Sequence, residues 1–485
     1  MAAHCDLLVI GGGINGAGIA RDAAGRGLKV LLAERGDLGA ATSSASSKLI
    51  HGGLRYLEHF EFRLVAEALA EREVLLRVAA HLVRPMLFVM PHAPGLRPRW
   101  MIRLGLFLYD HLARRSLLPG SQPVRLDRSG YGEALRPGLR HGFLYSDCAV
   151  DDSRLVIANA RDARARGTRV LPRTEVLSAR RSDGAWLARL ASGEQVRARA
   201  IVNAAGPWAK RVLDERLGER PAAAVRLVQG THIVVPRRYP GEHAFILQND
   251  DGRVVFVIPF EERFTLIGTT EVPLQDDPDA ARPSREEVEY LCQAASRYLA
   301  RALEPSEVVW RYAGVRPLSD DGRREASAVT RDYTLHLTED EGRAPVLSVF
   351  GGKITTYRSL AEHAMDKLRP YFPDLKGPWT ARTPLPGSDF SSREEARREL
   401  FNRYRALPAH VVQGVFRRHG ALAHAVLGDG LLGEDYGAGL TERELRYFME
   451  EEWAASAEDV LWRRSKLGLH LDERQITRVA ERIGR

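Results

Sequence analysis

One stretch near the N-terminus, residues 6–34, constrains the fold of this chain more than any other. It begins with a short apolar run, typical of a strand that is buried on both faces of a parallel sheet. Three glycines follow in the spacing G-x-G-x-x-G: Gly11, Gly13 and Gly16. The chain continues with a helical pattern and a second apolar run that ends in Glu34. A strand, turn, helix and strand in this order predict a dinucleotide-binding unit.

Each part of this unit has a physical role. Gly11 permits a tight turn, Gly13 lets the backbone approach a pyrophosphate, and Gly16 lets helix and strand pack closely. The pyrophosphate would lie at the positive end of the helix dipole, among backbone N–H groups that lack partners. The carboxylate of Glu34 would accept hydrogen bonds from the ribose hydroxyls. This run alone leaves open whether the dinucleotide is FAD or NAD.

The composition is that of a globular protein with several domains. The chain has 485 residues, of which 44% are hydrophobic and 28% are charged, and a single core rarely grows beyond about 250–300 residues. We therefore expect two or three domains. Its three cysteines are far apart and form no C-x-x-C pair. We expect neither disulfides nor a metal site, and a reducing, cytoplasmic environment.

The net charge of +8 suggests an anionic partner, such as nucleic acid, phospholipid headgroups or a phosphorylated metabolite. A codon-driven preference for arginine explains much of this charge, because only seven of the 71 basic residues are lysines. That scarcity draws attention to Lys48 and Lys353, which both lie inside motifs. We expect no nucleic-acid partner, because no basic face is interleaved with aromatic residues.

Any membrane contact is expected to be peripheral. No apolar run reaches the roughly 18 residues that a spanning helix needs, and the first strand starts too near the N-terminus to leave room for a signal peptide. The best candidate for contact is the run 100–112, where Trp, Tyr and Leu are flanked by arginines. Such a helix suits a headgroup interface. A buried core helix would explain the same apolar content.

Two more turns of small residues follow predicted strands, at 203–208 (NAAGPW) and 350–356 (FGGKITT). Three turns of this kind in one chain suit a ligand longer than a mononucleotide. The hydroxyl-rich loop 41–53 should wrap around that ligand. Antiparallel strands are predicted between 225 and 270, where the substrate is expected to bind. A connector rich in proline and glycine at 383–387 marks a domain boundary.

Helical periodicity predicts helices at 62–81 and 284–302. Beyond the connector the chain is expected to be all-helical. The predicted helices there are 393–404, 409–419, 421–427, 441–455 and 457–465. The fourth should begin with a capping box formed by Thr441 and Glu444.

Four segments together resemble the FAD-dependent glycerol-3-phosphate dehydrogenases, and most of all the aerobic respiratory enzymes of bacteria. They are the glycine run 10–27, the loop SSASSKLIHGGLRYLE, the run NAAGPW and the run FGGKITTYRSLAEHA. The resemblance covers essentially the whole chain. It implies an α/β fold (α+β overall), with a Rossmann-like FAD-binding domain of the D-amino-acid-oxidase/glutathione-reductase type. An antiparallel β substrate domain would be inserted into it, and a helical cap domain would follow.

The expected FAD-binding domain comprises 1–80, 145–225 and 340–380, and the substrate domain comprises 81–144 and 226–339. The C-terminal helical domain spans 388–485.

The resemblance implies a flavoenzyme that oxidises sn-glycerol 3-phosphate to dihydroxyacetone phosphate through non-covalently bound FAD. Electrons would pass to ubiquinone or menaquinone, and a homodimer would lie on the inner face of the cytoplasmic membrane as a monotopic protein. The alternatives are an oxidase of the same fold that uses oxygen, an amine or amino-acid oxidase, and, less favoured, a tRNA-directed flavoprotein.

The resemblance also implies which residues contact FAD. The N-terminal set is Gly11, Gly13, Ile14, Asn15, Gly16, Glu34 and Arg35, followed in the loop by Thr42, Ser43, Ser46, Ser47, Lys48, Leu49, His51, Gly52 and Gly53. The later set is Val176, Ala205, Gly206, Trp208, Gly314, Arg316, Gly352, Lys353, Ile354 and Thr355.

Oxidation of a secondary alcohol needs a hydride acceptor, a base for the hydroxyl proton and cations for the phosphate. The flavin provides the first. His232 and His51 are the candidate bases, because an imidazole titrates near working pH, although each could be a structural histidine. The expected substrate-binding residues are Arg55, Tyr56, Arg316, Arg331 and Lys353. Arg316 could instead stabilise the developing oxygen charge and so take part in catalysis.

Overall fold

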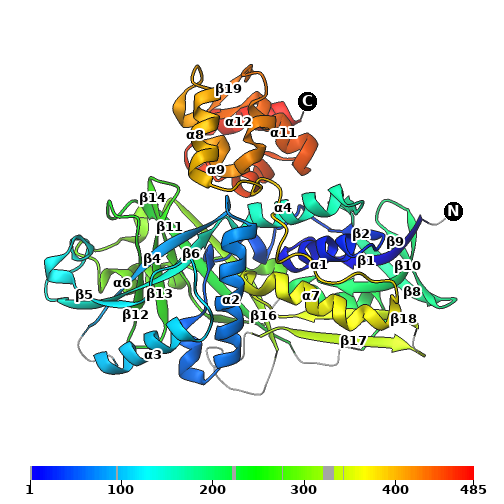
Figure 1. Ribbon diagram of the computed structural model, residues 1–485, viewed down its shortest axis with the longest axis horizontal. Coiled ribbons are helices and arrows are strands. Elements are labelled where there is room, and N and C mark those ends of the chain that lie inside the picture. Colours follow the sequence, from blue (N-terminus) through cyan, green and yellow to red (C-terminus); the bar gives the residue numbers. More distant parts are fainter. Residues whose placement is uncertain are drawn as a thin grey trace.

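The structure is a computed structural model that describes residues 3–93, 97–220, 225–275, 277–319, 332–341 and 343–484. Two large β-sheets lie beside one another, and a mostly helical C-terminal domain sits above them in Figure 1. Arg331, one of the expected phosphate ligands, lies outside the described residues.

The first sheet contains the predicted dinucleotide-binding unit. Its strands, in spatial order, are β17 (Thr334–Asp340), β18 (Arg343–Phe350), β10 (Gln195–Asn203), β1 (Ala3–Ile10), β2 (Val30–Ala33) and β7 (Arg169–Leu171). All neighbours from β18 to β7 are parallel, and β17 is antiparallel to β18. Leu7, Leu8 and Val9 are completely buried, as expected for a strand covered on both faces.

Helices cover one face of this sheet and a β-meander covers the other. The helices are α1 (Ile14–Gly25), α4 (Asp152–Ala165) and α7 (Tyr357–Leu368), which share one core with β1 and β2. The meander is formed by β8 (Val176–Ser182), which pairs with β9 (Ala185–Leu190), and β9 in turn pairs with β10. The short helix α5 (Ala209–Arg211) packs beside it. A turn at Asp183–Gly184 joins β8 to β9, and both residues have positive φ, as a tight hairpin turn requires.

The second sheet is largely antiparallel, as predicted. Its spatial order is β15 (Val272–Leu274), β11 (Val225–Pro236), β14 (Phe264–Gly268), β13 (Val254–Phe260), β12 (Ala244–Gln248), β4 (Val83–Pro91), β6 (His141–Val150) and β3 (Leu49–Ile50). Two further strands join it, β16 (Trp310–Ser319) on β11 and β5 (Gln122–Arg125) on β6. The helices α2 (Phe62–Val78) and α3 (Arg99–His111) pack on one face, and α6 (Arg285–Ser296) packs on the other.

The prediction that α6 continues to residue 302 was wrong, because the helix ends at Ser296. The next residues pair with a different segment instead. Arg136 donates its backbone N–H to the carbonyl of Tyr298 at 2.8 Å, and Ala300 donates to the carbonyl of Ala134 at 2.9 Å. Tertiary pairing therefore replaces the last helical turns.

The C-terminal domain is built from α8 (Arg393–Arg403), α9 (Ala409–His419), α10 (Ala423–Leu427), α11 (Glu442–Glu452) and α12 (Glu473–Ile483). A single π-helical segment, Asp459–Arg464, stands where a fifth α-helix was predicted. The sequence also did not indicate the small hairpin β19 (Asp435–Gly437) and β20 (Leu440–Thr441).

The expected capping box at α11 is only half formed. The side chain of Thr441 accepts a hydrogen bond from the backbone N–H of Glu444 at 3.4 Å. The carboxylate of Glu444 instead accepts hydrogen bonds from Arg418 at 2.6 and 2.7 Å. A buried ion pair thus takes the side chain that would have closed the box.

Candidate active site

The glycine turn after β1 leaves no room for side chains. Gly11 has φ +108°, and a Cβ built there would lie 2.5 Å from the carbonyl oxygen of Ala204 at the end of β10. A Cβ at Gly16 would lie 1.8 Å from the carbonyl oxygen of Gly11. Both contacts are with backbone, so both positions accept only glycine, as the sequence predicted from the needs of a dinucleotide turn.

Glu34 ties the end of β2 to this turn. Its carboxylate accepts hydrogen bonds from the backbone N–H of Gly12 at 2.6 Å and of Gly36 at 2.7 Å. Burial raises the pKa of this carboxyl group. The guanidinium group of the next residue, Arg35, lies 4.3 Å from the ring centroid of Trp208. The structure thus places the Glu34 loop, the first glycine turn and the 203–208 turn side by side.

The hydroxyl-rich loop 42–53 connects the glycine turn to the second sheet. Ser43 accepts a hydrogen bond from the backbone N–H of Ile14 at 2.9 Å, and Thr42 donates to the carbonyl oxygen of Val315 at 2.7 Å. The hydroxyl of Ser47 lies 2.8 Å from Nε2 of His232. The loop therefore bridges the cofactor side and the predicted substrate side.

The turn at 350–356 lies beside the glycine turn that follows β1. Asn15 donates its side-chain N–H to the carbonyl oxygen of Gly351 at 3.3 Å. Both Gly351 and Gly352 have positive φ. In the same region His51 donates its backbone N–H to the hydroxyl of Thr355 at 3.3 Å. The turn at 350–356 thus contacts Asn15 and the loop 42–53, which are more than 300 residues away in the sequence. These segments together are called the cradle.

His232, on β11, has the properties of a neutral base. Its side chain is 1% exposed, and its ring stacks on Tyr312 at 5.0 Å between centroids. Burial, together with the positive charges of Arg316 and Lys48, holds the pKa of His232 well below its ordinary value of 6.5. Its Nδ1 atom has no hydrogen-bond partner among the described residues. The imidazole is therefore neutral and has one nitrogen available.

Lys48 is buried in an ion pair rather than exposed to a ligand. Its ammonium group donates to Asp152 at 2.9 Å and to the carbonyl oxygen of Ser44 at 2.9 Å. The same carboxylate accepts from the hydroxyl of Ser46 at 2.7 Å. The ammonium group also lies 4.9 Å from the ring centroid of Tyr312.

Three of the expected phosphate ligands have the following neighbours. Lys353 lies with its ammonium group 3.8 Å from the ring centroid of Tyr56, and Arg316 donates to the hydroxyl of Thr269 at 3.2 Å. A guanidinium nitrogen of Arg55 lies 3.8 Å from the carboxylate of Glu271.

The remaining cofactor candidates lie mostly around the same cradle. Leu49 forms part of β3, Gly53 has φ +79° against the ring of Tyr56, and a Cβ at Gly314 would lie 3.0 Å from Ala45. Val176 instead begins β8 and belongs to the core beneath the meander. Its contribution to a cofactor site stays a prediction.

Sequence reasoning missed several residues that support the site. Asp152 accepts hydrogen bonds from Ser46 and Lys48, and Tyr312 donates its hydroxyl to the carbonyl oxygen of Ser46 at 2.9 Å. Tyr109, on α3, accepts a hydrogen bond from the backbone N–H of Gly52 at 2.8 Å and donates to Asp147 at 2.7 Å. Arg72 also donates to Asp147 at 2.6 Å. These are isolated residues outside any motif, so no local pattern could have identified them.

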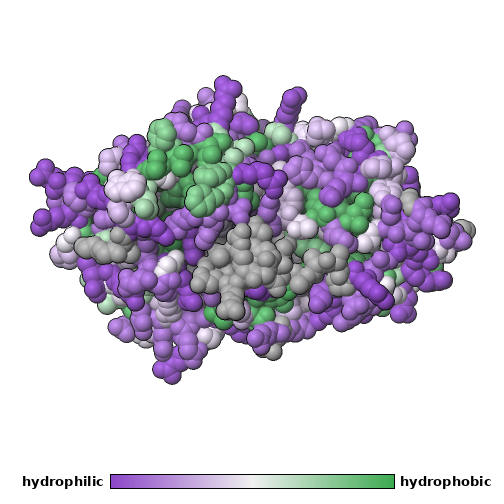
Figure 2. All heavy atoms as spheres, turned by 90° about the horizontal axis from the view of Figure 1, so that it is seen from below, coloured by the Kyte–Doolittle hydropathy of each residue, from purple (hydrophilic) through white to green (hydrophobic). Residues whose placement is uncertain are grey.

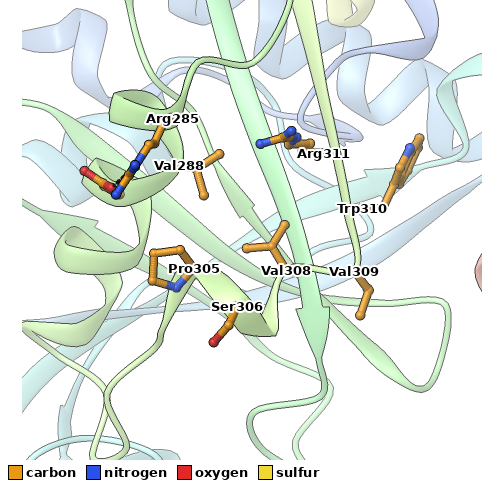
Figure 3. A pocket seen from close by; sticks show the side chains of 9 residues that line it. Arg285, Val288, Pro305, Ser306, Val308, Val309, Trp310 and Arg311 are labelled. Carbon is orange, nitrogen blue, oxygen red and sulfur yellow. Dashed lines mark hydrogen bonds and ion pairs between the residues drawn. The ribbon is translucent and has the colours of Figure 1, made fainter.

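A separate groove of about 550 Å³ lies between α6 and the start of β16 (Figure 3). It contains none of the residues expected to bind substrate or FAD. Its lining residues are Arg285, Val288, Glu289, Pro305, Ser306, Val308, Val309, Trp310 and Arg311. The site is therefore defined by the cradle and not by this groove.

Comparison with known proteins identifies the family. Residues 6–358 match the family model of FAD dependent oxidoreductases, and residues 378–485 match that of the C-terminal domain of alpha-glycerophosphate oxidase. The chain is 53% identical to a glycerol-3-phosphate dehydrogenase of Pseudomonas aeruginosa, over 98% of this chain and 94% of that protein. The chain belongs to the FAD-dependent glycerol-3-phosphate dehydrogenase family.

Two other similarities refine this result. This member of the family is 48% identical to a D-erythritol 1-phosphate dehydrogenase of Brucella abortus, over 97% of this chain and 95% of that protein. It is also similar to the solved structure of a glycerol-3-phosphate dehydrogenase from Bacillus halodurans complexed with FAD. The TM-score is 0.76 at 25% identity, over 99% of this chain and 94% of that chain. The fold class and FAD as the cofactor are thereby confirmed.

The residues present fit FAD. Gly11 and Gly16 have no space for a Cβ, and the side-chain oxygen of Asn15 is buried without a hydrogen-bond partner among the described residues. When bound, FAD provides the hydride acceptor. In the described part of the chain, no group of three or more His, Cys, Asp or Glu residues is placed to hold a metal ion.

Proposed function

We propose that this enzyme oxidises sn-glycerol 3-phosphate to dihydroxyacetone phosphate and passes the electrons from FAD to ubiquinone or menaquinone. The observation that carries this proposal is the position of His232. Its ring is neutral and buried, it contacts the cofactor loop through Ser47, and it lies in the field of Arg316. A base beside a fixed cation suits removal of a proton from a phosphorylated alcohol.

Proton removal and phosphate binding are assigned to different residues of the chain. His232 takes the hydroxyl proton, and Ser47 orients its ring through Nε2. Arg316 and Lys353 bind the phosphate, with Tyr56 packed against Lys353. His51 stays the second candidate base, because its backbone lies at the cradle beside Thr355.

D-Erythritol 1-phosphate is a second candidate substrate, because one relative that is 48% identical is named for it. Steady-state rates with a soluble quinone analogue should separate the two. We expect kcat/KM to be higher for glycerol 3-phosphate than for D-erythritol 1-phosphate. A preference for the longer polyol phosphate would replace the proposed substrate. Reoxidation of the reduced enzyme by air faster than by quinone would favour the oxygen-dependent alternative.

Replacement of Arg316 by lysine is expected to weaken the binding of a phosphate-containing analogue that cannot be oxidised. Arginine offers a planar fork that holds phosphate oxygens in pairs, and lysine offers a single point charge. We expect a rise in Kd of roughly tenfold or more, since charge-assisted hydrogen bonds contribute about 1.5–3 kcal/mol. Isothermal titration of the FAD-bound variant measures this. An unchanged Kd would show that Arg316 does not contact the phosphate.

We also propose that α3 lies on the inner face of the cytoplasmic membrane and that the enzyme is a homodimer. One side of α3 is core, with Ile102, Leu106 and Tyr109 buried. The other side exposes large apolar side chains, and the neighbouring segment 60–62 extends this surface, which forms a hydrophobic patch in Figure 2. The exposed residues are Trp100 (66%), Met101 (42%), Leu104 (51%), Phe107 (49%), Phe60 (78%) and Phe62 (39%).

An exposed patch of this kind beside arginines supports an interfacial helix. Among the described residues, no helix has the length and apolar character needed to cross a bilayer. The two interpretations of residues 100–112 are therefore compatible, because one face of the helix packs in the core while the other is exposed.

Replacement of Leu104 and Phe107 by glutamine should reduce binding to vesicles that contain anionic lipids. An apolar side chain that is buried in the lipid interface contributes at most about 1.5–3 kcal/mol to the free energy of binding. We therefore expect each replacement to lower partitioning into the vesicles roughly tenfold. Vesicle sedimentation measures this. Leu431→Gln is the control, because Leu431 is 76% exposed in the C-terminal domain. If Leu431→Gln weakened binding as much, α3 would not be the contact surface.

A further inference from the structure

We propose that the segment 459–466 of the C-terminal domain, here called the clasp segment, is a positioning element of the FAD site. It contacts three different parts of that site, two through buried charged side chains and one through the half-buried ring of Trp462. The inference uses the confirmed cofactor and does not depend on which polyol phosphate is oxidised.

The first contact holds the loop that follows Glu34. Asp37 accepts hydrogen bonds from Arg464 at 2.5 and 2.8 Å and from Arg463 at 2.6 Å. Both Asp37 and Arg464 are buried. Arg464 is itself oriented by the carbonyl oxygen of Glu452, to which its Nε donates at 3.0 Å.

The loop held in this way is part of the dinucleotide turn. Glu34 accepts from the backbone N–H of Gly12, and Gly39 donates its backbone N–H to the carbonyl oxygen of Gly12 at 3.0 Å. Asp37 lies between these two attachments. The ion pair therefore fixes the side of the turn from which Glu34 is predicted to reach the ribose of FAD.

The second contact holds the loop predicted to line the flavin. The ammonium group of Lys466 donates to the hydroxyl of Ser153 at 2.8 Å, and that hydroxyl donates to the carbonyl oxygen of Arg463 at 2.8 Å. The adjacent residue, Asp152, binds Ser46 and Lys48. Burial lowers the pKa of Lys466, and the charge of Asp151 opposes that shift. The contact thus reaches the flavin loop through α4.

The third contact holds β16. The ring of Trp462 stacks on Trp310 with 4.5 Å between centroids and 27° between planes. The same strand carries Tyr312, which stacks on His232, and Arg316. One short segment is therefore attached to the adenosine side, to the flavin loop and to the strand that carries the catalytic candidates.

Simple docking of the C-terminal domain is the alternative to be separated, because other ion pairs also join it to the rest of the chain. Arg417, on α9, donates to Glu261 at 2.5 Å, at the turn between β13 and β14. Among the described residues, neither side chain of that pair forms a hydrogen bond with a loop of the FAD site, although Arg417 lies in the field of Asp151. It therefore provides a matched control.

The test measures the Kd of FAD for apoprotein by the change in flavin fluorescence on binding. Removing one partner of a buried ion pair leaves an unpaired charge, so we expect Asp37→Asn and Arg464→Met each to raise Kd roughly 10- to 100-fold. Arg464→Lys should restore part of the affinity. The double variant should be no weaker than the single variants, because the two residues act as one unit. Arg417→Met should stay within about threefold of the wild type.

Lys466→Met should leave FAD bound but alter the visible spectrum of the bound flavin, with Lys466→Arg closer to the wild type. Circular dichroism checks that each variant is folded. If Arg464→Met does not fold, the FAD affinity of the nearly isosteric variant Asp37→Asn tests the proposal instead. Equal FAD affinities of wild type, Asp37→Asn and Arg417→Met would overturn the proposal. A loss of affinity in Arg417→Met as large as in Asp37→Asn would also overturn it, because any weakening of the domain contact would then suffice.

Discussion

Replacement of His232 by alanine is expected to slow the reduction of bound FAD by roughly 10²–10⁴-fold, the usual contribution of a positioned general base. FAD should stay bound, because the glycine turns that are predicted to hold it do not involve this ring. Stopped-flow measurement of flavin reduction by glycerol 3-phosphate gives the rate, and the visible spectrum gives the FAD content. The effect is large because the neutral imidazole is buried beside two cations and no solvent molecule can replace it easily.

The control for this experiment is His243→Ala. His243 is a half-buried histidine, and burial lowers its pKa to about 4, but its ring packs between Tyr131 and Phe245. Its removal should leave flavin reduction near the wild-type rate. A fall of less than about threefold in His232→Ala would remove His232 as the base and leave His51 as the candidate.

The pH dependence follows from the same residue. The base must be neutral, and its pKa in the folded protein lies well below 6.5. The rate of flavin reduction should therefore stay constant as the pH falls through 6.5 and should decline only at lower pH. A decline centred on the ordinary histidine pKa would indicate an exposed base instead.

Replacement of Gly16 by alanine is expected to abolish tight FAD binding. The new Cβ would lie 1.8 Å from the carbonyl oxygen of Gly11, so the turn itself has to move. Overpacking costs about 1–3 kcal/mol and occasionally more, and here the strain falls on the pyrophosphate site. We expect the Kd of FAD to rise roughly 100-fold or more, as measured by fluorescence titration of the apoprotein.

Gly105→Ala provides the matched control for the same chemical change. Apart from its chain neighbours and the backbone of its own helix, no atom lies within 4 Å of a Cβ built at Gly105, which is inside α3. Alanine favours helix over glycine by about 1 kcal/mol, so this variant should bind FAD normally and unfold at a slightly higher temperature. Normal FAD affinity in Gly16→Ala would show that the turn does not hold the pyrophosphate.

Local patterns predicted the parts of the site that are made by backbone. The roles of Gly11 and Gly16 follow from a spacing within one short segment, and the structure confirms that neither position has room for a Cβ. The antiparallel strands β11, β13 and β14 were likewise predicted, from short β stretches with the spacing of an antiparallel sheet. Such features depend on residues that are close together in the sequence, so a local pattern is enough to predict them.

Features that depend on distant partners were not predicted. Asp152 supports the flavin loop although it is 106 residues from Ser46, and Glu444 leaves its capping box because Arg418 is close in space. The choice of FAD over NAD came from the resemblance and the comparisons, because both cofactors place the same adenosine diphosphate on the glycine turn.

The contacts between the C-terminal domain and the rest of the chain also depend on residues that are distant in the sequence. The helices α8 to α11 were predicted, but α12 and the π-helical form of 459–464 were not. No pattern in 459–466 indicates that Arg464 pairs with Asp37, which is 427 residues away. Only the fold brings these two side chains together.

Anaerobic reduction of the purified, FAD-loaded enzyme measures the proposed reaction at its first step. Glycerol 3-phosphate, plain glycerol, and glycerol with inorganic phosphate are each added without oxygen, and the yellow absorption band of oxidised flavin is followed. If the enzyme oxidises a phosphorylated alcohol, the band should disappear with glycerol 3-phosphate and persist with the other two additions. Bleaching by plain glycerol, or a band that persists with glycerol 3-phosphate, would contradict the proposed function.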